Sequence, residues 1–316
     1  MPESYVPKIS VCIPTFNGAD YLRQAVESVL DQNSQNYEIV IVDNSSDDQT
    51  VRIIEDLKKD GDGRIRFYQN NQNIGLAGNL NKCLEYAQGE YIKFLCVDDL
   101  LQPECLEKMS TALDTHQSVT LVCGGRVYIS ETNKKLGSKR YASQSIIVPG
   151  NKAISRCLYG KCYMGEPSAV MFRKKDLTGP FREDLPQLMD MEMWFRLLEQ
   201  GELLSIERPL CSIRMHSEQM TYKNIRSGKL LDDNVKLFDS YSQKSYLEIT
   251  PLLVIQHKIL MAYRVWISRK FISDKKKKLV LRKYASKLAY LMMPLVWCVI
   301  GLKKWTVRRI IYFQKI

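Results

Sequence analysis

Two adjacent carboxylates, those of Asp98 and Asp99, end an apolar run in the segment FLCVDDL, residues 94–100. Like charges held a few ångströms apart disfavour joint ionisation, so a strand that ends in such a pair needs a positive partner nearby. Mg²⁺ and Mn²⁺ prefer oxygen ligands, and Mg²⁺ typically combines one or two protein carboxylates with phosphate and water. The pair therefore indicates a divalent-cation site, although an isolated Asp-Asp pair also occurs in solvated loops and helix caps.

Apolar, β-branched segments alternate with amphipathic segments along the first part of the chain. The pattern predicts strands at 8–14, 37–43, 65–70 and 91–97, and helices at 21–32, 48–60, 75–89 and 103–116. Strict strand–helix alternation predicts a parallel, doubly wound sheet. Later elements are less regular, with strands expected at 119–130 and 167–174, a helix at 188–201, and a strand pair or extended segment at 203–216.

Polar residues follow three of the predicted strands. They form PTFN at 14–17, VDNSS at 42–46 and VDD at 97–99. Ligands of doubly wound sheets bind beyond the carboxyl ends of the strands, so we expect these three segments to converge on one cleft. The aspartate pair would then lie at the mouth of a ligand site.

The net charge of +11 is distributed unevenly. Residues 251–316 contain sixteen Lys or Arg and one acid, whereas the other 250 residues carry a net charge of −4. Such asymmetry indicates an anionic partner for the basic segment, either a membrane surface or nucleic acid. The segment is apolar and has no recognisable nucleic-acid-binding motif, so we expect an anionic membrane surface and no nucleic acid.

An uncharged run of 15 residues, 288–302, lies within the basic segment and contains Pro294. A membrane-spanning helix needs about 17–25 residues, so a helix lying in the plane of the interface suits the run and its aromatic residues better. A helical subdomain packed on the rest of the protein is the alternative.

Two further features bear on location. The first ten residues, MPESYVPKIS, lack the basic and apolar regions of a signal peptide. The nine cysteines form no CxxC pair, which is typical of reduced thiols. We therefore expect a cytoplasmic protein that binds peripherally to the inner face of the membrane.

The order of the motifs resembles family 2 of the glycosyltransferases, which have the GT-A nucleotide-diphospho-sugar fold. The matching segments are ISVCIPTFNGADYLRQAVESVLDQ, YEIVIVDNSSDDQT, NIGLAGNLNKCLEYAQGEYIKFLCVDD, MDMEMWFRL and IRMH, within residues 8–220. The resemblance implies an α/β fold with a Rossmann-like, mostly parallel sheet flanked by helices. It implies a catalytic domain at 1–225, followed here by a basic helical C-terminal region at 226–316.

The resemblance also implies a nucleotide-sugar site at the strand ends. Asp43 would bind the base or the ribose, unless it only caps a turn. Ser45 replaces a glycine that is common in the family. The turn after the first strand, Pro14-Thr15-Phe16-Asn17, would line the nucleotide pocket, and Asn73 would also bind the nucleotide-sugar.

At the diphosphate, the resemblance assigns Asp99 as the direct ligand of Mg²⁺ or Mn²⁺. Asp98 would contact the ribose or the water shell of the metal, and Arg214 and His216 would lie near the diphosphate. Cys96 stands where the family often has a further acid, which affects the expected ribose contacts more than the metal site.

The segment MDMEMWFRL resembles a family motif whose second acid is the catalytic base. This register assigns the base to Asp190, with Met189 in place of the usual glutamate, and leaves Glu192 as the alternative. Trp194 suits the core better than a sugar platform. The QxxRW motif of processive members is absent from the sequence, which favours the addition of one sugar per encounter.

The resemblance therefore implies a metal-dependent, inverting hexosyl- or N-acetylhexosaminyltransferase. It would move one sugar from a nucleotide-diphospho-sugar to a glycan or lipid-linked acceptor in cell-surface polysaccharide or glycolipid synthesis. A sugar-nucleotide nucleotidyltransferase is an alternative, but it would need a Gly-rich basic loop that PTFNGADYL does not provide. A catalytically inactive membrane-surface binding protein is the other alternative.

Overall fold

The computed structural model describes residues 6–59, 63–160 and 163–294, and the chain divides into two compact units. The first unit contains Met1–Gly150, Tyr163–Asp184 and Met189–Arg214. The second contains Asn151–Cys162, Leu185–Leu188 and Met215–Ile316. The second unit thus combines the C-terminal part of the chain with two short segments from earlier in the sequence.

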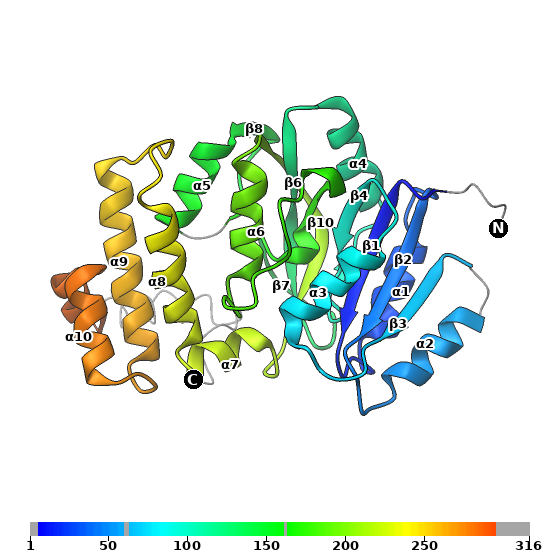
Figure 1. The fold of residues 1–316 in the computed structure, drawn as a ribbon, viewed down its shortest axis with the longest axis horizontal. Helices are drawn as coiled ribbons and strands as arrows, with labels where there is room; N and C mark the ends of the chain where they lie inside the picture. The colour runs from blue at the N-terminus through cyan, green and yellow to red at the C-terminus, as the bar shows by residue number, and fades with distance from the viewer. Residues whose placement is uncertain (1–5, 60–62, 161–162, 295–316) are drawn as a thin grey trace. The chain divides into compact units, whose positions relative to one another are not determined.

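One ten-stranded sheet forms the first unit, in the order β3-β2-β1-β4-β9-β6-β10-β5, with β7 beside β6 and β8 beside β10 (Figure 1). Pairing is parallel among β3, β2, β1 and β4, and antiparallel where β9 joins β4 and β6. The α/β class is confirmed, with the parallel pairing among these four strands. The strands are β1 Ile9–Thr15, β2 Tyr37–Asp43, β3 Ile65–Gln69, β4 Tyr91–Phe94, β5 Leu100–Leu101, β6 Val119–Ser130, β7 Lys135–Lys139, β8 Ile146–Pro149, β9 Val170–Arg173 and β10 Glu202–Met215.

Helices flank this sheet, and their buried side chains pack against it to form the core of the first unit. All seven residues of β1 and of β2 are buried, as expected for parallel strands covered on both faces. Trp194 is fully buried against Phe172 and Phe181, which makes it a core residue. The helices of this unit are α1 Leu22–Leu30, α2 Thr50–Lys59, α3 Gly75–Tyr86, α4 Cys105–Thr115 and α6 Met189–Leu198, with the short 3₁₀ turns η1 Pro167–Ala169 and η2 Lys174–Asp176.

One element differs from its predicted form, and another takes one of its two expected forms. β4 ends at Phe94 rather than at residue 97, because the Cys96 amide donates to the Ser168 hydroxyl at 2.9 Å instead of continuing the ladder. The segment expected as a strand pair or an extended segment at 203–216 is the single extended strand β10. Its Pro209 lies between the part that pairs with β8 and the part that pairs with β5.

The second unit is helical. Its helices are α5 Gly150–Leu158, α7 Met220–Arg226, α8 Lys229–Tyr241, α9 Pro251–Ser268 and α10 Asp274–Lys283, and α9 contacts both α8 and α10 (Figure 1). A cluster around Leu231, Met261 and Val265 forms its core. Within the described ranges, every helix is too short or too polar to cross a membrane. Most of the uncharged run at 288–302 lies outside the described residues.

Candidate functional site

The ends of β1 and β2 lie side by side. Thr15 pairs with Asp43 in the parallel register, and the Asn44 amide donates to the Thr15 carbonyl at 2.8 Å. The turn after β1 packs against Val97, which immediately precedes the aspartate pair. A Cβ atom at Gly18 in this turn would lie only 2.7 Å from the Val97 side chain. Only a residue without a side chain fits there. These contacts confirm that the three polar segments converge.

The turn after β1 is tied to the turn after β2. Asn17 Nδ2 donates to the Asp47 carboxylate at 2.7 Å, and the Asp47 amide donates back to Asn17 Oδ1 at 3.1 Å. The Asn17 amide donates to Ser46 Oγ at 2.8 Å. Ser45 has a φ of 65°, the left-handed conformation that the expected glycine would adopt without strain. Asn17 therefore lies at the rim of the converging segments, while Pro14 and Thr15 are buried beneath it.

Asp43 is fully buried and accepts three hydrogen bonds. The Ser46 amide and Gln69 Nε2 each donate to Oδ2 at 3.0 Å, and the Ser46 hydroxyl donates to Oδ1. Asp43 thus makes the turn-capping contacts that were the alternative to nucleotide binding. Its expected role at the base or the ribose stays a prediction.

Asparagine side chains join the turn after β2 to the start of α3. Asn44 Nδ2 donates to Asn73 Oδ1 at 2.9 Å, and Asn70 Nδ2 donates to Asn44 and Asn79 at 3.1 and 3.0 Å. Asn73 is exposed beside this network, next to the strand ends. The supporting asparagines were missed from the sequence, although their concentration after β2 and β3 was a usable signal.

The two aspartates differ in environment. Asp98 is half-buried, whereas Asp99 is 3% exposed. Asp99 Oδ1 accepts the Arg214 amide at 2.9 Å, and Oδ2 accepts the Ser168 hydroxyl at 2.6 Å. Burial, followed by the charge of Asp98, raises the pKa of Asp99 well above its usual value. The mutual repulsion expected from the sequence is thus present in the structure.

Arg214 lies at this pair as a buried clamp. Its Nε donates to the Asp98 carbonyl at 2.8 Å, and its guanidinium stacks over the Tyr21 ring at 4.7 Å. The other guanidinium nitrogens donate to the Ser130 and Glu131 carbonyls and to the side chains of Asn133 and Gln24. In this arrangement Arg214 fixes the loops around the pair, and its expected contact with the diphosphate stays a prediction. His216 follows β10 and belongs to the second unit, so its role also stays a prediction.

The donor set suits a hard divalent cation. One ligand atom each of Cys96, Asp98 and Asp99 lies within 4.8 Å of the others. Two carboxylates match the preference of Mg²⁺ and Mn²⁺ for oxygen, whereas a thiol is a soft ligand. Burial, followed by the charges of the two aspartates, raises the pKa of Cys96 well above its usual value. The aspartates are therefore the residues that fit the expected metal.

Asp190 lies in the first turn of α6 and is half-buried. Its Oδ1 accepts the amide of Met191 at 2.7 Å, and the positive end of the helix dipole stabilises negative charge there. The charge of Asp190 is the smallest of the contributions that raise the pKa of Cys96, which lies two residues before Asp98. The role of Asp190 as the catalytic base stays a prediction.

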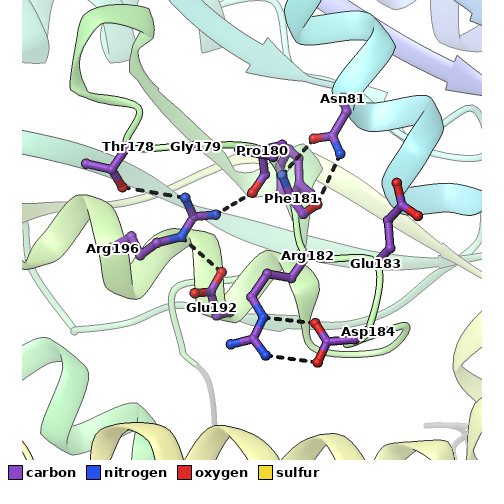
Figure 2. A pocket seen from close by; sticks show the side chains of 10 residues that line it. All are labelled: Asn81, Thr178, Gly179, Pro180, Phe181, Arg182, Glu183, Asp184, Glu192 and Arg196. Atoms are coloured by element: carbon purple, nitrogen blue, oxygen red, sulfur yellow. Dashed lines mark hydrogen bonds and ion pairs between the residues drawn. The ribbon is translucent and has the colours of Figure 1, made fainter.

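Glu192, the alternative base, has a different environment. It is buried and pairs with Arg196 Nε at 3.0 Å. Figure 2 shows this pair in a pocket of about 540 Å³, where Arg196 also donates to the Pro180 carbonyl at 2.7 Å. Asn81 closes another side of the pocket through two hydrogen bonds to the Phe181 backbone. These contacts give Glu192 a structural role.

Three residues near Asp99 were missed from the sequence. Ser168 donates to the carboxylate, and Lys93 is fully buried in β4 and donates to the Ser168 carbonyl. Glu166 forms an ion pair with Arg126 at 2.7 Å, and its charge contributes to the raised pKa of Asp99. A lysine inside the buried strand YIKF was a visible signal, because lysine is almost never fully buried without a partner. Ser168 and Glu166 carried no comparable signal.

Known proteins resemble this chain along most of its length. A family model described as Glycosyl transferase family 2 matches residues 10–178. The uncharacterized glycosyltransferase RT0329 of Rickettsia typhi is 30% identical over 224 residues, which cover 69% of this chain and 67% of that protein.

Two solved structures share the fold. The mannosyltransferase PcManGT of Pyrobaculum calidifontis, in complex with GDP-Man and Mn²⁺, has a TM-score of 0.59 at 16% identity over 97% of this chain and 85% of its own. TarS 1–349 of S. aureus, in complex with UDP-GlcNAc, has a TM-score of 0.53 at 18% identity over 86% of each chain. The chain belongs to glycosyl transferase family 2 and has the GT-A fold.

Proposed function

We propose that this family 2 glycosyltransferase transfers one hexosyl or N-acetylhexosaminyl group from a nucleotide-diphospho-sugar to a hydroxyl acceptor, with inversion of the anomeric carbon. One observation supports the proposal: Asp190 is half-buried at the start of α6 and its charge acts on Cys96, two residues before Asp98, while Glu192 is held in an ion pair with Arg196. The site thus has a carboxylate for the acceptor and a separate carboxylate pair for the leaving group.

Asp190 acts as the general base in this proposal. It takes the proton from the acceptor hydroxyl while the hydroxyl oxygen attacks the anomeric carbon from the face opposite the diphosphate. The start of α6 stabilises the negative charge that a base requires before the reaction. A single displacement inverts the anomeric carbon and needs no covalent nucleophile.

Asp99 and Asp98 would hold Mg²⁺ or Mn²⁺, with Asp99 as the direct ligand. When bound, such a cation offsets the charge of the departing diphosphate as a Lewis acid. A positive charge beside Asp99 would also favour its ionised form, which burial and Asp98 disfavour. The Mn²⁺ in the mannosyltransferase structure supports this choice.

The donor site is assigned to the converging turns. Phe16 is 47% exposed between buried Thr15 and the hydrogen-bonded Asn17, so its ring offers a stacking surface for a nucleobase. UDP-GlcNAc in TarS and GDP-Man in the mannosyltransferase support a nucleotide-diphospho-sugar as the donor. Asp43 and Asn73 remain our candidates for contacts with the base or the ribose.

The second unit supports a membrane-bound acceptor. Along α9, Leu252, Ile255 and Ile259 are 63%, 54% and 47% exposed and lie on one face, opposite the buried His257 and Met261. Residues 251–294 contain eleven Lys or Arg and one acid. An apolar helix face with basic surroundings suits the surface of an anionic membrane. We therefore propose peripheral binding at the cytoplasmic face and a lipid-linked or cell-surface glycan precursor as acceptor.

A donor screen tests the enzymatic proposal. UDP or GDP release is measured from a panel of UDP- and GDP-sugars, with Mn²⁺ or with EDTA, for wild type, Asp190→Asn and Glu192→Gln. Wild type should release nucleotide from one donor only with metal, and Asp190→Asn should lose about 10²–10⁴-fold in turnover while still binding that donor. Glu192→Gln should retain turnover. If Glu192→Gln is the inactive variant and Asp190→Asn stays active, the base is assigned wrongly.

A further inference from the structure

The hydroxyl of Ser168 has one defined orientation. Ser168 is fully buried in η1, and its Oγ accepts the Cys96 amide at 2.9 Å. A hydroxyl has a single proton, and an amide can only donate, so the proton of Ser168 must point elsewhere. It points to Asp99 Oδ2, which lies 2.6 Å away. The Cys96 amide thus sets the direction of the hydrogen bond to Asp99.

Lys93 fixes the backbone that carries this hydroxyl. It is fully buried in the middle of β4, and its Nζ donates to the carbonyls of Ser168 and, at 3.2 Å, Val170. Within the described part of the chain, the hydrogen bonds recorded for its Nζ go to these backbone carbonyls. A buried ammonium is costly to retain for such contacts alone. Its position is explained if the placement of Ser168 matters.

The two hydrogen bonds to Asp99 come from different parts of the sheet. The Arg214 amide of β10 binds Oδ1, and the Ser168 hydroxyl binds Oδ2. Both bonds together fix the plane of the carboxylate and leave each oxygen one further lone pair. Residues that orient a metal-binding carboxylate in this way typically contribute 10–100-fold to metal affinity or activity.

We infer that Ser168 is a positioning residue for Asp99 and that Lys93 acts through it by holding the Ser168 peptide. The inference rests on the proposed function, because it assumes a divalent cation at Asp99. Ser168 contacts neither the sugar nor the nucleotide in this role. It orients the carboxylate before the cation and the diphosphate arrive.

Ser10 provides a matched control in the same unit. It is also fully buried, accepts a backbone amide, that of Gly89, at 2.8 Å, and donates to a carboxylate, that of Glu38, at 2.6 Å. It lies five residues before Thr15, the last residue of β1. Ser10→Ala therefore removes the same kind of interaction away from the aspartate pair, with a similar loss of stability expected.

The test measures the dissociation constant of Mn²⁺, with UDP or GDP present, from the electron paramagnetic resonance of free Mn²⁺. Ser168→Ala should raise this constant about 10–100-fold, whereas Ser10→Ala should leave it within about twofold of wild type. Thermal unfolding of both variants shows whether stability accounts for the difference. Equal Mn²⁺ affinity in Ser168→Ala and Ser10→Ala would overturn the inference.

Two further variants keep the test decisive. Ser168→Cys preserves the shape of the side chain, but its thiol is a weak donor, so its Mn²⁺ affinity should lie between those of wild type and Ser168→Ala. If Ser168→Ala does not fold, wild-type Mn²⁺ affinity in Ser168→Cys would overturn the inference. Lys93→Met should weaken Mn²⁺ binding in wild type but add little to Ser168→Ala, and additive losses would separate Lys93 from Ser168. If wild type binds no Mn²⁺ yet transfers sugar, the proposed metal role fails and the inference fails with it.

Discussion

Lowering the pH from 7.5 to 5.0 should destabilise the second unit through one buried imidazole. His257 of α9 is 4% exposed and stacks on Phe238 with the ring centroids 3.9 Å apart. Among the described residues, neither of its ring nitrogens has a hydrogen-bond partner of good geometry. Burial, assisted by the charge of Arg264, lowers the pKa of His257 from 6.5 to about 4, and the nearby Leu158 backbone offsets only part of this change.

The sign and size of the effect follow from proton linkage. Between pH 6.5 and 4 the unfolded chain binds a proton at His257 that the folded chain does not bind. The contribution of neutral His257 to stability is therefore complete above pH 6.5 and is lost as the pH falls toward 4. At pH 5.0 the solution is about 1.5 pH units below the pKa of the unfolded chain and still above that of the folded chain. The free energy of unfolding is therefore lower by about 2 kcal/mol than above pH 6.5.

Urea unfolding of the full chain at pH 7.5 and 5.0 measures this loss for wild type and for His257→Phe. Phenylalanine keeps the stack on Phe238, needs no hydrogen bond and does not titrate. Because the other ionisable groups are common to both proteins, the difference between their pH effects isolates His257. Wild type should lose about 2 kcal/mol more than the variant. Equal losses in the two proteins would refute the reasoning.

Two other predictions concern the site and the basic region. Asp99→Asn should weaken metal-dependent donor binding and lower transfer by orders of magnitude, and transfer that persists unchanged in EDTA would contradict the metal role. The full chain should float with anionic liposomes and lose only part of its binding in 1 M salt, where the Debye length is about 3 Å instead of about 8 Å. Replacing Leu252, Ile255 and Ile259 together by serine should abolish the liposome binding that remains in 1 M salt. If wild type does not bind anionic vesicles, the membrane surface is excluded as a partner.

The strand ends were predictable because their signals are local. β1 and β2 are continuous apolar runs, and the polar residues that follow them mark the edge of the sheet. The convergence of these residues follows from parallel pairing alone. The aspartate pair and Asp190, our candidate for the base, also belong to compact motifs, so the resemblance implied one common site for them.

Other features depend on contacts between distant residues. The diphosphate contact that the resemblance implies for Arg214 stays a prediction, whereas its hydrogen bonds to the Asp98 carbonyl, 116 residues away, and to the carbonyls at the end of β6 were not predicted. Lys93 was visible as a charge within a buried strand, yet its acceptor on Ser168 lies 75 residues further along. Backbone carbonyls are the same in every residue, so no side-chain pattern announces such partners. The burial of Glu192, the alternative base, in an ion pair with Arg196 could not be predicted either. An acid and a base four residues apart are also common on exposed helices, so their spacing does not indicate burial.

The interleaving of the two units limits how this enzyme can be recombined. The chain passes from one unit to the other at residues 150, 162, 184, 188 and 214. A module attached by one linker can be exchanged by a single crossover, but a chimaera that replaced the whole second unit would need five junctions. Two of these, at 184 and 188, lie within six residues of Asp190. The properties of the second unit are therefore easier to change by point substitutions on α9 than by grafting the unit from another protein.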